Sequence, residues 1–115
     1  MQKLLLTLMI VPIIGFGQCE GNCENGLGNY TYDSGDSYYG IWKDGQRHGL
    51  GTYYWTNGNY WYGRWKEGNR HGTGKMAYED GDTYIGQWSN GERHYLGIFI
   101  DANSTKAQWR NYSHG

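Results

Sequence analysis

From Gly26 onward the chain alternates, residue by residue, between two kinds of position. In residues 38–43, Tyr38, Gly40 and Trp42 fall on one side of an extended chain and their sequence neighbours fall on the other. Residues 49–56 repeat this arrangement, with glycine or an aromatic residue at every second position. A period of two is typical of a β-strand with two different faces. The pattern predicts strands over both segments, and no helical period occurs elsewhere.

Short polar turns separate the predicted strands. Asp44-Gly45 and Asn90-Gly91 are dipeptides of the kind that close tight β-hairpins, because they tolerate the positive φ angles of primed turns. Longer turn sequences at 33–36, 56–59 and 79–82 lead from each hairpin to the next. The fold class expected is therefore all-β, an elongated antiparallel meander of stacked hairpins in a single sheet.

The hairpins repeat with a constant period. The spacing from Gly40 to Gly63 is the same as that from Gly63 to Gly86. The aligned positions carry glycine, tryptophan, glycine and histidine in turn: Gly40, Gly63 and Gly86; Trp42, Trp65 and Trp88; Gly45, Gly68 and Gly91; His48, His71 and His94. A constant period of this length indicates a solenoid-like array whose units need their neighbours for stability.

Each unit reads Tyr-x-Gly-x-Trp, a polar turn with glycine, and then His-Gly-x-Gly before an aromatic pair. The sequence resembles the MORN repeat family in these motifs, over residues 26–101, as a half-unit followed by three units. The resemblance implies protein–protein contacts, and it also implies association with membranes or phospholipids.

Several repeat glycines stand in mid-strand, where glycine is otherwise unfavourable. Something must approach the backbone closely there, and we expect the Trp and Tyr rings of adjacent strands. The structural repeat positions are Gly40, Trp42, Gly63, Trp65, Gly86 and Trp88.

The last unit departs from the pattern, since Tyr95 replaces glycine and the strand that follows is more apolar. We interpret it as a terminal cap. Residues 102–115 have no repeat signature; residues 106–112 are expected either to add one more strand, through Trp109 and Tyr112, or to belong to a disordered tail.

Residues 1–17 carry an early lysine, an apolar run too short to span a bilayer, and small residues at the end. They are interpreted as a signal peptide cleaved before Gln18, which makes the protein exported (periplasmic, cell-surface or secreted). A lipoprotein anchored through Cys19 is disfavoured because Gln18 is not small, and a retained N-terminal anchor is the remaining alternative.

Residues 18–25 hold both cysteines, Cys19 and Cys23, and a disulfide between them is the simplest expectation for an exported chain. The formal net charge of −1, with both signs interspersed, gives no polybasic patch for nucleic acid and no strong attraction to an anionic membrane. Aromatic residues make up 17% of the chain, so they are expected to supply the packing that aliphatic residues cannot.

No motif predicts catalysis, a cofactor, a metal or a small-molecule substrate. Histidines one unit apart would lie about 10 Å from each other in a meander, too far to share an ion; each is expected to hydrogen-bond turn backbone. The acidic turns lack the ligand pattern of a calcium loop, and Asn59 replaces a carboxylate in one of them. We expect solvated turns.

With no motif for catalysis or metal binding, the functional feature expected is a binding surface. The candidate binding surface consists of the aromatic residues predicted on the opposite or edge positions of the strands: Tyr39, Tyr54, Tyr60 and Tyr62. The leading hypothesis is a non-enzymatic scaffold that binds a protein or another envelope component, phospholipid included. The alternative is carbohydrate or cell-wall binding through exposed aromatics, and an enzyme subunit is the weakest reading.

Overall fold

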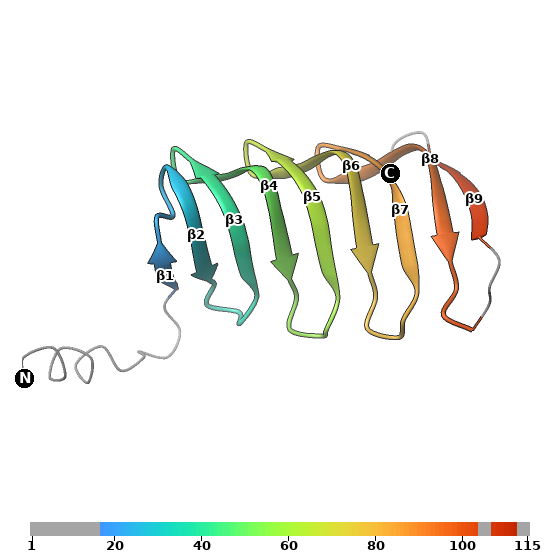
Figure 1. Ribbon diagram of the computed structural model, residues 1–115, viewed down its shortest axis with the longest axis horizontal. Helices are drawn as coiled ribbons and strands as arrows, with labels where there is room; N and C mark the ends of the chain where they lie inside the picture. Colours follow the sequence, from blue (N-terminus) through green and yellow to red (C-terminus); the bar gives the residue numbers. More distant parts are fainter. Residues whose placement is uncertain (1–16, 104–106, 113–115) are drawn as a thin grey trace, which may run out of the picture.

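The computed structural model describes residues 17–103 and 107–112, which form one antiparallel sheet with no helix. Neighbours in sequence are neighbours in the sheet throughout, so the strands run in order from the N-terminal end to the C-terminal end (Figure 1). The strands are β1 (Gln18–Gly21), β2 (Gly26–Thr31), β3 (Ser37–Lys43), β4 (Gln46–Tyr54), β5 (Tyr60–Lys66), β6 (Asn69–Ala77), β7 (Thr83–Ser89), β8 (Glu92–Ile100) and β9 (Ala107–Tyr112). The predicted meander of hairpins is confirmed.

The tight turns have the backbone that their sequences predict. Asp44 and Gly45 have φ angles of 51° and 76°, and the two later hairpins repeat this pair of positive values. Two consecutive positive φ angles define a turn whose twist matches that of the flanking strands. The turn therefore holds each hairpin in register, from the pairing of Lys43 with Gln46 onward.

The aromatic rings of alternate positions gather on one side of the sheet, here called the inner face. Its buried side chains are Tyr38, Trp42, Trp61, Trp65, Met76, Tyr84 and Trp88. The rings meet edge to face along the sheet: Trp61 lies 5.2 Å from Trp65 and 5.5 Å from Trp88, between ring centroids. Such contacts are favourable for aromatic quadrupoles. A single sheet thus buries a core without a second layer.

The mid-strand glycines are bare because a ring occupies the space of their side chain. A Cβ on Gly51 would lie 2.0 Å from the hydroxyl oxygen of Tyr38, and one on Gly74 would lie 2.0 Å from the ring of Trp61. For these glycines the ring comes from the adjacent strand, as expected. For Gly40 the prediction was incomplete: its nearest neighbour is the Cα of Gly51, at 2.4 Å, and the nearby ring is that of Tyr38 in its own strand.

Two of the three repeat tryptophans, Trp42 and Trp65, are hydrogen-bonded to the preceding strand. Trp42 Nε1 donates a hydrogen bond to the carbonyl of Gly28 at 3.0 Å, and Trp65 Nε1 donates to the carbonyl of Gly51 at 3.1 Å. Such a partner satisfies a buried indole N–H, whereas Nε1 of Trp61 and Nε1 of Trp88 have none among the described residues. Each bond ties a hairpin to the strand before it.

Turns are also bonded to turns along both margins of the sheet. On one margin the N–H groups of Gly45, Gly68 and Gly91 donate to carbonyls of the preceding unit, at 3.0, 3.0 and 3.1 Å. On the other, the side chains of Asp36, Asn59 and Asp82 accept backbone N–H groups of the following turn, at 3.0, 2.9 and 2.9 Å. An amide oxygen accepts as well as a carboxylate, so Asn59 fits the series. These three side chains are turn-to-turn acceptors, in addition to being turn residues as expected.

The last described strand is β9, which pairs with β8 through Ile98 and Trp109. The additional strand considered for residues 106–112 is therefore present over Ala107–Tyr112. The predicted signal peptide falls almost wholly on residues 1–16, outside the described residues.

Replacing Gly74 by alanine should destabilise the protein by about 3 kcal/mol, because the new methyl group would overlap the fully buried ring of Trp61. Denaturant unfolding followed by near-ultraviolet circular dichroism measures the change. Lys75→Ala, at the next position on the exposed face, is the matched control and should change stability by less than about 0.5 kcal/mol. Equal stability of Gly74→Ala and the wild type would contradict the packing.

Candidate functional site

Arginine side chains cover the inner face. The guanidinium of Arg47 lies 4.8 Å from the ring centroid of Trp65 and donates a hydrogen bond to the carbonyl of Gly68 at 2.7 Å. Arg70 repeats both contacts one unit later, with Trp88 at 4.4 Å and the carbonyl of Gly91. A planar cation over an aromatic face is attracted by the ring quadrupole while its edge stays free to donate. The arginines thus close the inner face and tie it to the next turn.

A β-bulge positions these arginines. The pairing of β3 with β4 shifts between Gly40 and Trp42, and Gly49, opposite the shift, has a φ of 62°. A bulge bends its strand, and Arg47 lies in the segment beyond it. The same shift recurs in β5–β6 and β7–β8.

Sequence reasoning missed the arginines, although the signal was available: Arg47, Arg70 and Arg93 recur with the period of the repeat, each directly before the repeat histidine. Arg93 lies 4.9 Å from the ring centroid of Tyr84 and donates to the hydroxyl of Tyr78 at 3.1 Å.

Burial changes the acidity of several inner-face groups. Burial and the neighbouring charge of Arg93 lower the pKa of Arg70. Burial and the carboxylate of Asp36, to which its hydroxyl donates at 3.0 Å, raise the pKa of Tyr53 to about 12. Burial also raises the pKa of Tyr38. The hydroxyls of Tyr38 and Tyr53 therefore remain neutral hydrogen-bond donors.

Hollows lie along the inner face of the described part of the chain, and one near its N-terminal end is large. Its volume is about 880 Å³, against about 190 and about 270 Å³ for the two that follow it along the sheet. We call it the N-terminal pocket. It lies between the loop that joins β1 to β2 and the first two hairpin turns, and Tyr30, Tyr32 and Trp42 line it together with Arg47.

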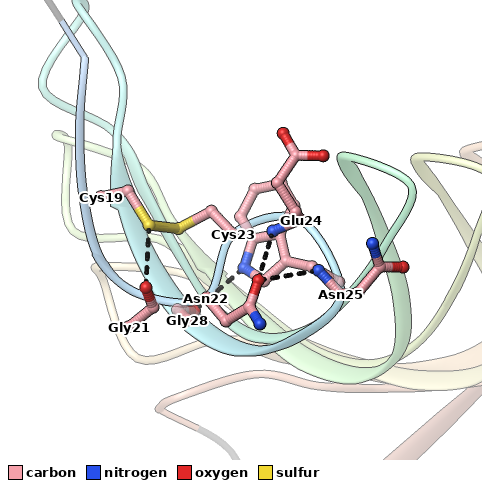
Figure 2. The surroundings of a disulfide bond; sticks show 8 residues. Cys19, Gly21, Asn22, Cys23, Glu24, Asn25 and Gly28 are labelled. Atoms are coloured by element: carbon pink, nitrogen blue, oxygen red, sulfur yellow. Dashed lines mark hydrogen bonds between the residues drawn. A yellow bond between two sulfur atoms is a disulfide. The ribbon is translucent and has the colours of Figure 1, made fainter.

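A disulfide forms one wall of this pocket. Cys19 and Cys23 are bonded, with their Cα atoms 6.2 Å apart, and both line the hollow. Figure 2 shows the bond beside a loop in which the Asn22 side-chain oxygen accepts the N–H groups of Glu24 and Asn25, at 3.1 and 2.9 Å. Such bonds from an asparagine side chain fix a short turn. The predicted pair thus lies at bonding distance and braces the loop.

The four tyrosines nominated from the sequence all lie on the opposite, outer face. Thr52 pairs with both Tyr39 and Tyr62, so these two rings flank it in one row. Tyr54 and Tyr60 pair in the next row, with centroids 6.0 Å apart. Tyr39 and Tyr62 are each 49% exposed, far more than any ring of the core. Together the four rings form the outer tyrosine patch.

The near-neutral net charge conceals a separation of charge. Strands β3 to β6 contain no aspartate or glutamate, and their outer face carries Lys43, Arg64, Lys66 and Lys75, all exposed. The acidic residues of these units lie in the turns instead, at 33, 36, 44, 67, 79, 80 and 82. Of these bases, Lys75 pairs with Tyr62 and Arg64 lies two residues beyond Tyr62 in β5, so positive side chains lie beside the tyrosine patch.

No candidate metal site occurs among the described residues. His48, His71 and His94 lie in separate hairpins, and within the described ranges no three His, Cys, Asp or Glu side chains are grouped to hold an ion. The hydrogen bond expected from each imidazole to turn backbone stays a prediction. The part of the chain that is described forms no helix long and apolar enough to cross a bilayer.

An open array of hairpins with two distinct side-chain faces defines a β-repeat protein. The family model of the MORN repeat matches residues 24–37, 38–60, 61–83 and 84–106, and the chain belongs to the MORN repeat family. The matches extend slightly beyond the expected range of 26–101 at both ends. Such repeats generally mediate association with proteins or membrane phospholipids, and the proteins that carry them are generally non-catalytic binding modules. No curated protein matches the chain.

Replacing Arg70 by alanine should lower the free energy of unfolding by about 2 kcal/mol, because both the stacking on Trp88 and a charged hydrogen bond are lost. Arg70→Lys should recover only part of that loss, since an ammonium cannot stack and bond the turn together. Arg64→Ala removes the same residue type from the outer face and serves as the control in chemical denaturation. A cost as large for Arg64→Ala as for Arg70→Ala would contradict a structural role of the inner arginines.

Proposed function

We propose that this protein is an exported, non-enzymatic binding module that docks on an anionic surface of the cell envelope through the outer face of β3 to β6. The observation that carries the proposal is the composition of that face: half-exposed tyrosines among lysine and arginine side chains, with no carboxylate in the four strands. Tyrosine and basic residues together suit the interface between water and anionic head groups.

The tyrosines are free for this role because the core does not need them. The rings of Tyr39 and Tyr62 are half exposed, whereas Tyr38 and Trp61, their sequence neighbours, are fully buried on the inner face. Each basic residue near an anionic surface contributes about 1 kcal/mol of attraction. The four outer-face bases together would then supply about 4 kcal/mol, which salt would screen.

Export is supported by the cysteines and by the leader sequence. Disulfides persist in oxidising compartments outside the cytosol, and the Cys19–Cys23 bond lies directly after the expected cleavage point. A sulfur bonded to Cys23 cannot also carry a lipid, so the disulfide favours secretion over a lipoprotein anchored at Cys19.

The experiment below also distinguishes two other kinds of ligand for the outer face, a protein and a glycan. A protein partner would use the tyrosines as interface anchors, and a glycan would stack on them. Neither ligand needs the neighbouring bases, and for this reason we argue for the anionic surface.

The protein should sediment with vesicles of phosphatidylglycerol and phosphatidylcholine, and not with vesicles of phosphatidylcholine alone. The double variant Arg64→Gln/Lys75→Gln should bind the anionic vesicles about 30-fold more weakly, since two contributions of about 1 kcal/mol are lost. Raised salt should weaken binding of the wild type more than that of the variant.

Arg110→Gln, which removes a positive charge from β9, is the control and should bind like the wild type. Equal binding to both vesicle types, or none to either, would overturn the proposal. Capture of an envelope protein that depends on Tyr39 and Tyr62, without vesicle binding, would assign this face to a protein partner; saturable binding of a cell-wall glycan with the same dependence would assign it to carbohydrate.

A further inference from the structure

The loop that joins β1 to β2 occupies the place of a hairpin turn in the array. The carbonyls of Glu24, Arg47 and Arg70 accept the N–H groups of Gly45, Gly68 and Gly91 in turn. The spacing from each of these acceptors to the next equals the period of the repeat. Glu24 is therefore the first member of the series to which the inner arginines belong.

The later members show what this position holds. Arg47 places its guanidinium over Trp65 and donates to the carbonyl of Gly68, while Arg70 does the same with its own tryptophan and glycine. The equivalent ring for Glu24 is Trp42 and the equivalent glycine is Gly45. Glu24 is exposed, and a carboxylate neither donates to a carbonyl nor stacks favourably on a ring face. Trp42 is nevertheless only 6% exposed, and Cys23 packs against the buried cluster to which it belongs, so a small part of its ring faces the pocket.

The N-terminal pocket lies at this position, and its larger volume agrees with the change from arginine to glutamate. Trp42 and Gly45 both line it, as the corresponding residues line the smaller hollows. Two carboxylates, those of Glu24 and Glu67, also line it, against the single guanidinium of Arg47, which is engaged by Gly68. The local charge therefore favours a cationic group.

We propose that the N-terminal pocket binds a guanidinium group, and specifically the arginine side chain of a second protein. The guanidinium would lie between the carboxylates of Glu24 and Glu67, against the small exposed part of Trp42, and would donate to the carbonyl of Gly45. It would thereby reproduce from outside the hydrogen bond to a turn carbonyl that Arg47 and Arg70 form within the chain.

The chemistry of the lining favours arginine over other cations. A planar guanidinium can bond a carboxylate through two parallel N–H groups and still donate to a carbonyl, a geometry that an ammonium group does not match. Among the described residues, no aliphatic side chain lines the pocket, so a lipid tail or an aliphatic anchor finds no matching surface. The site lies on the inner face, and the inference does not rest on the outer-face function proposed above.

The size of the pocket favours an arginine carried by a peptide. A volume of about 880 Å³ is within the range of sites for whole ligands and exceeds what one guanidinium fills. The side-chain amides of Asn22, Gln46 and Asn69 line the same hollow, and amides can bond the backbone on either side of an inserted arginine. The disulfide holds the loop that carries Glu24.

The test is a titration of the oxidised protein with three tripeptide amides, acetylated Gly-Arg-Gly, Gly-Lys-Gly and Gly-citrulline-Gly, followed through the indole N–H resonance of Trp42. We expect a saturable shift with the arginine peptide, and binding of the neutral citrulline peptide that is about tenfold weaker or more. Agmatine, a free guanidine, should bind more weakly than the arginine peptide because it lacks the backbone contacts.

Two substitutions of Glu24 make the inference falsifiable. Glu24→Arg should abolish the shift and raise the melting temperature, since it restores the internal contact, and Glu24→Gln should weaken binding. Glu79→Gln, in an exposed turn on the other margin, is the matched control and should bind as the wild type does. Equal binding of the citrulline peptide, unchanged binding by Glu24→Arg, or no saturable shift at millimolar peptide would overturn the site. Agmatine binding as tightly as the peptide would overturn the assignment to a protein partner.

Discussion

The contact between an aromatic ring and bare glycine backbone is the constraint on which the rest of this protein depends. Tyr38, Trp61 and Tyr84 each lie where the side chains of two paired glycines would otherwise be, and all three are fully buried. Because the rings lie along the sheet, one layer of strands buries its own core. The constant period of the sequence follows from this arrangement, since each ring needs a glycine pair in its own hairpin.

The two faces of the sheet have different roles. The inner face is completed by arginines that stack on tryptophan and bond the next turn, so its charges are structural wherever the repeat is regular. The outer face contributes little to stability and carries the exposed tyrosines and bases. The two proposals come from the two faces. On the outer face, exposed tyrosine rings are not needed by the core. On the inner face, Glu24 occupies a position that holds arginine in the later units.

Much of the fold follows from local sequence, because strand alternation, turn dipeptides and repeat spacing are short-range signals. The dipeptide Asp44-Gly45 predicts the first tight turn. The alternation of Tyr38, Gly40 and Trp42 predicts which residues of that strand share one face of the sheet. The role of Arg47 could not be predicted in this way, since it depends on a bulge at Gly49 that brings a charged side chain over rings of the next unit. Which ring covers which glycine also required the register, and the N-terminal pocket required the three-dimensional equivalence of Glu24 with Arg47.

The most direct test of ring packing on glycine is a nuclear Overhauser measurement in the folded protein. The account predicts strong cross-peaks from the Hα protons of Gly51, Gly74 and Gly97 to the ring protons of Tyr38, Trp61 and Tyr84, respectively. Absence of these cross-peaks in the folded protein, with the same rings instead contacting the outer-face residues Thr52 and Lys75, would contradict it.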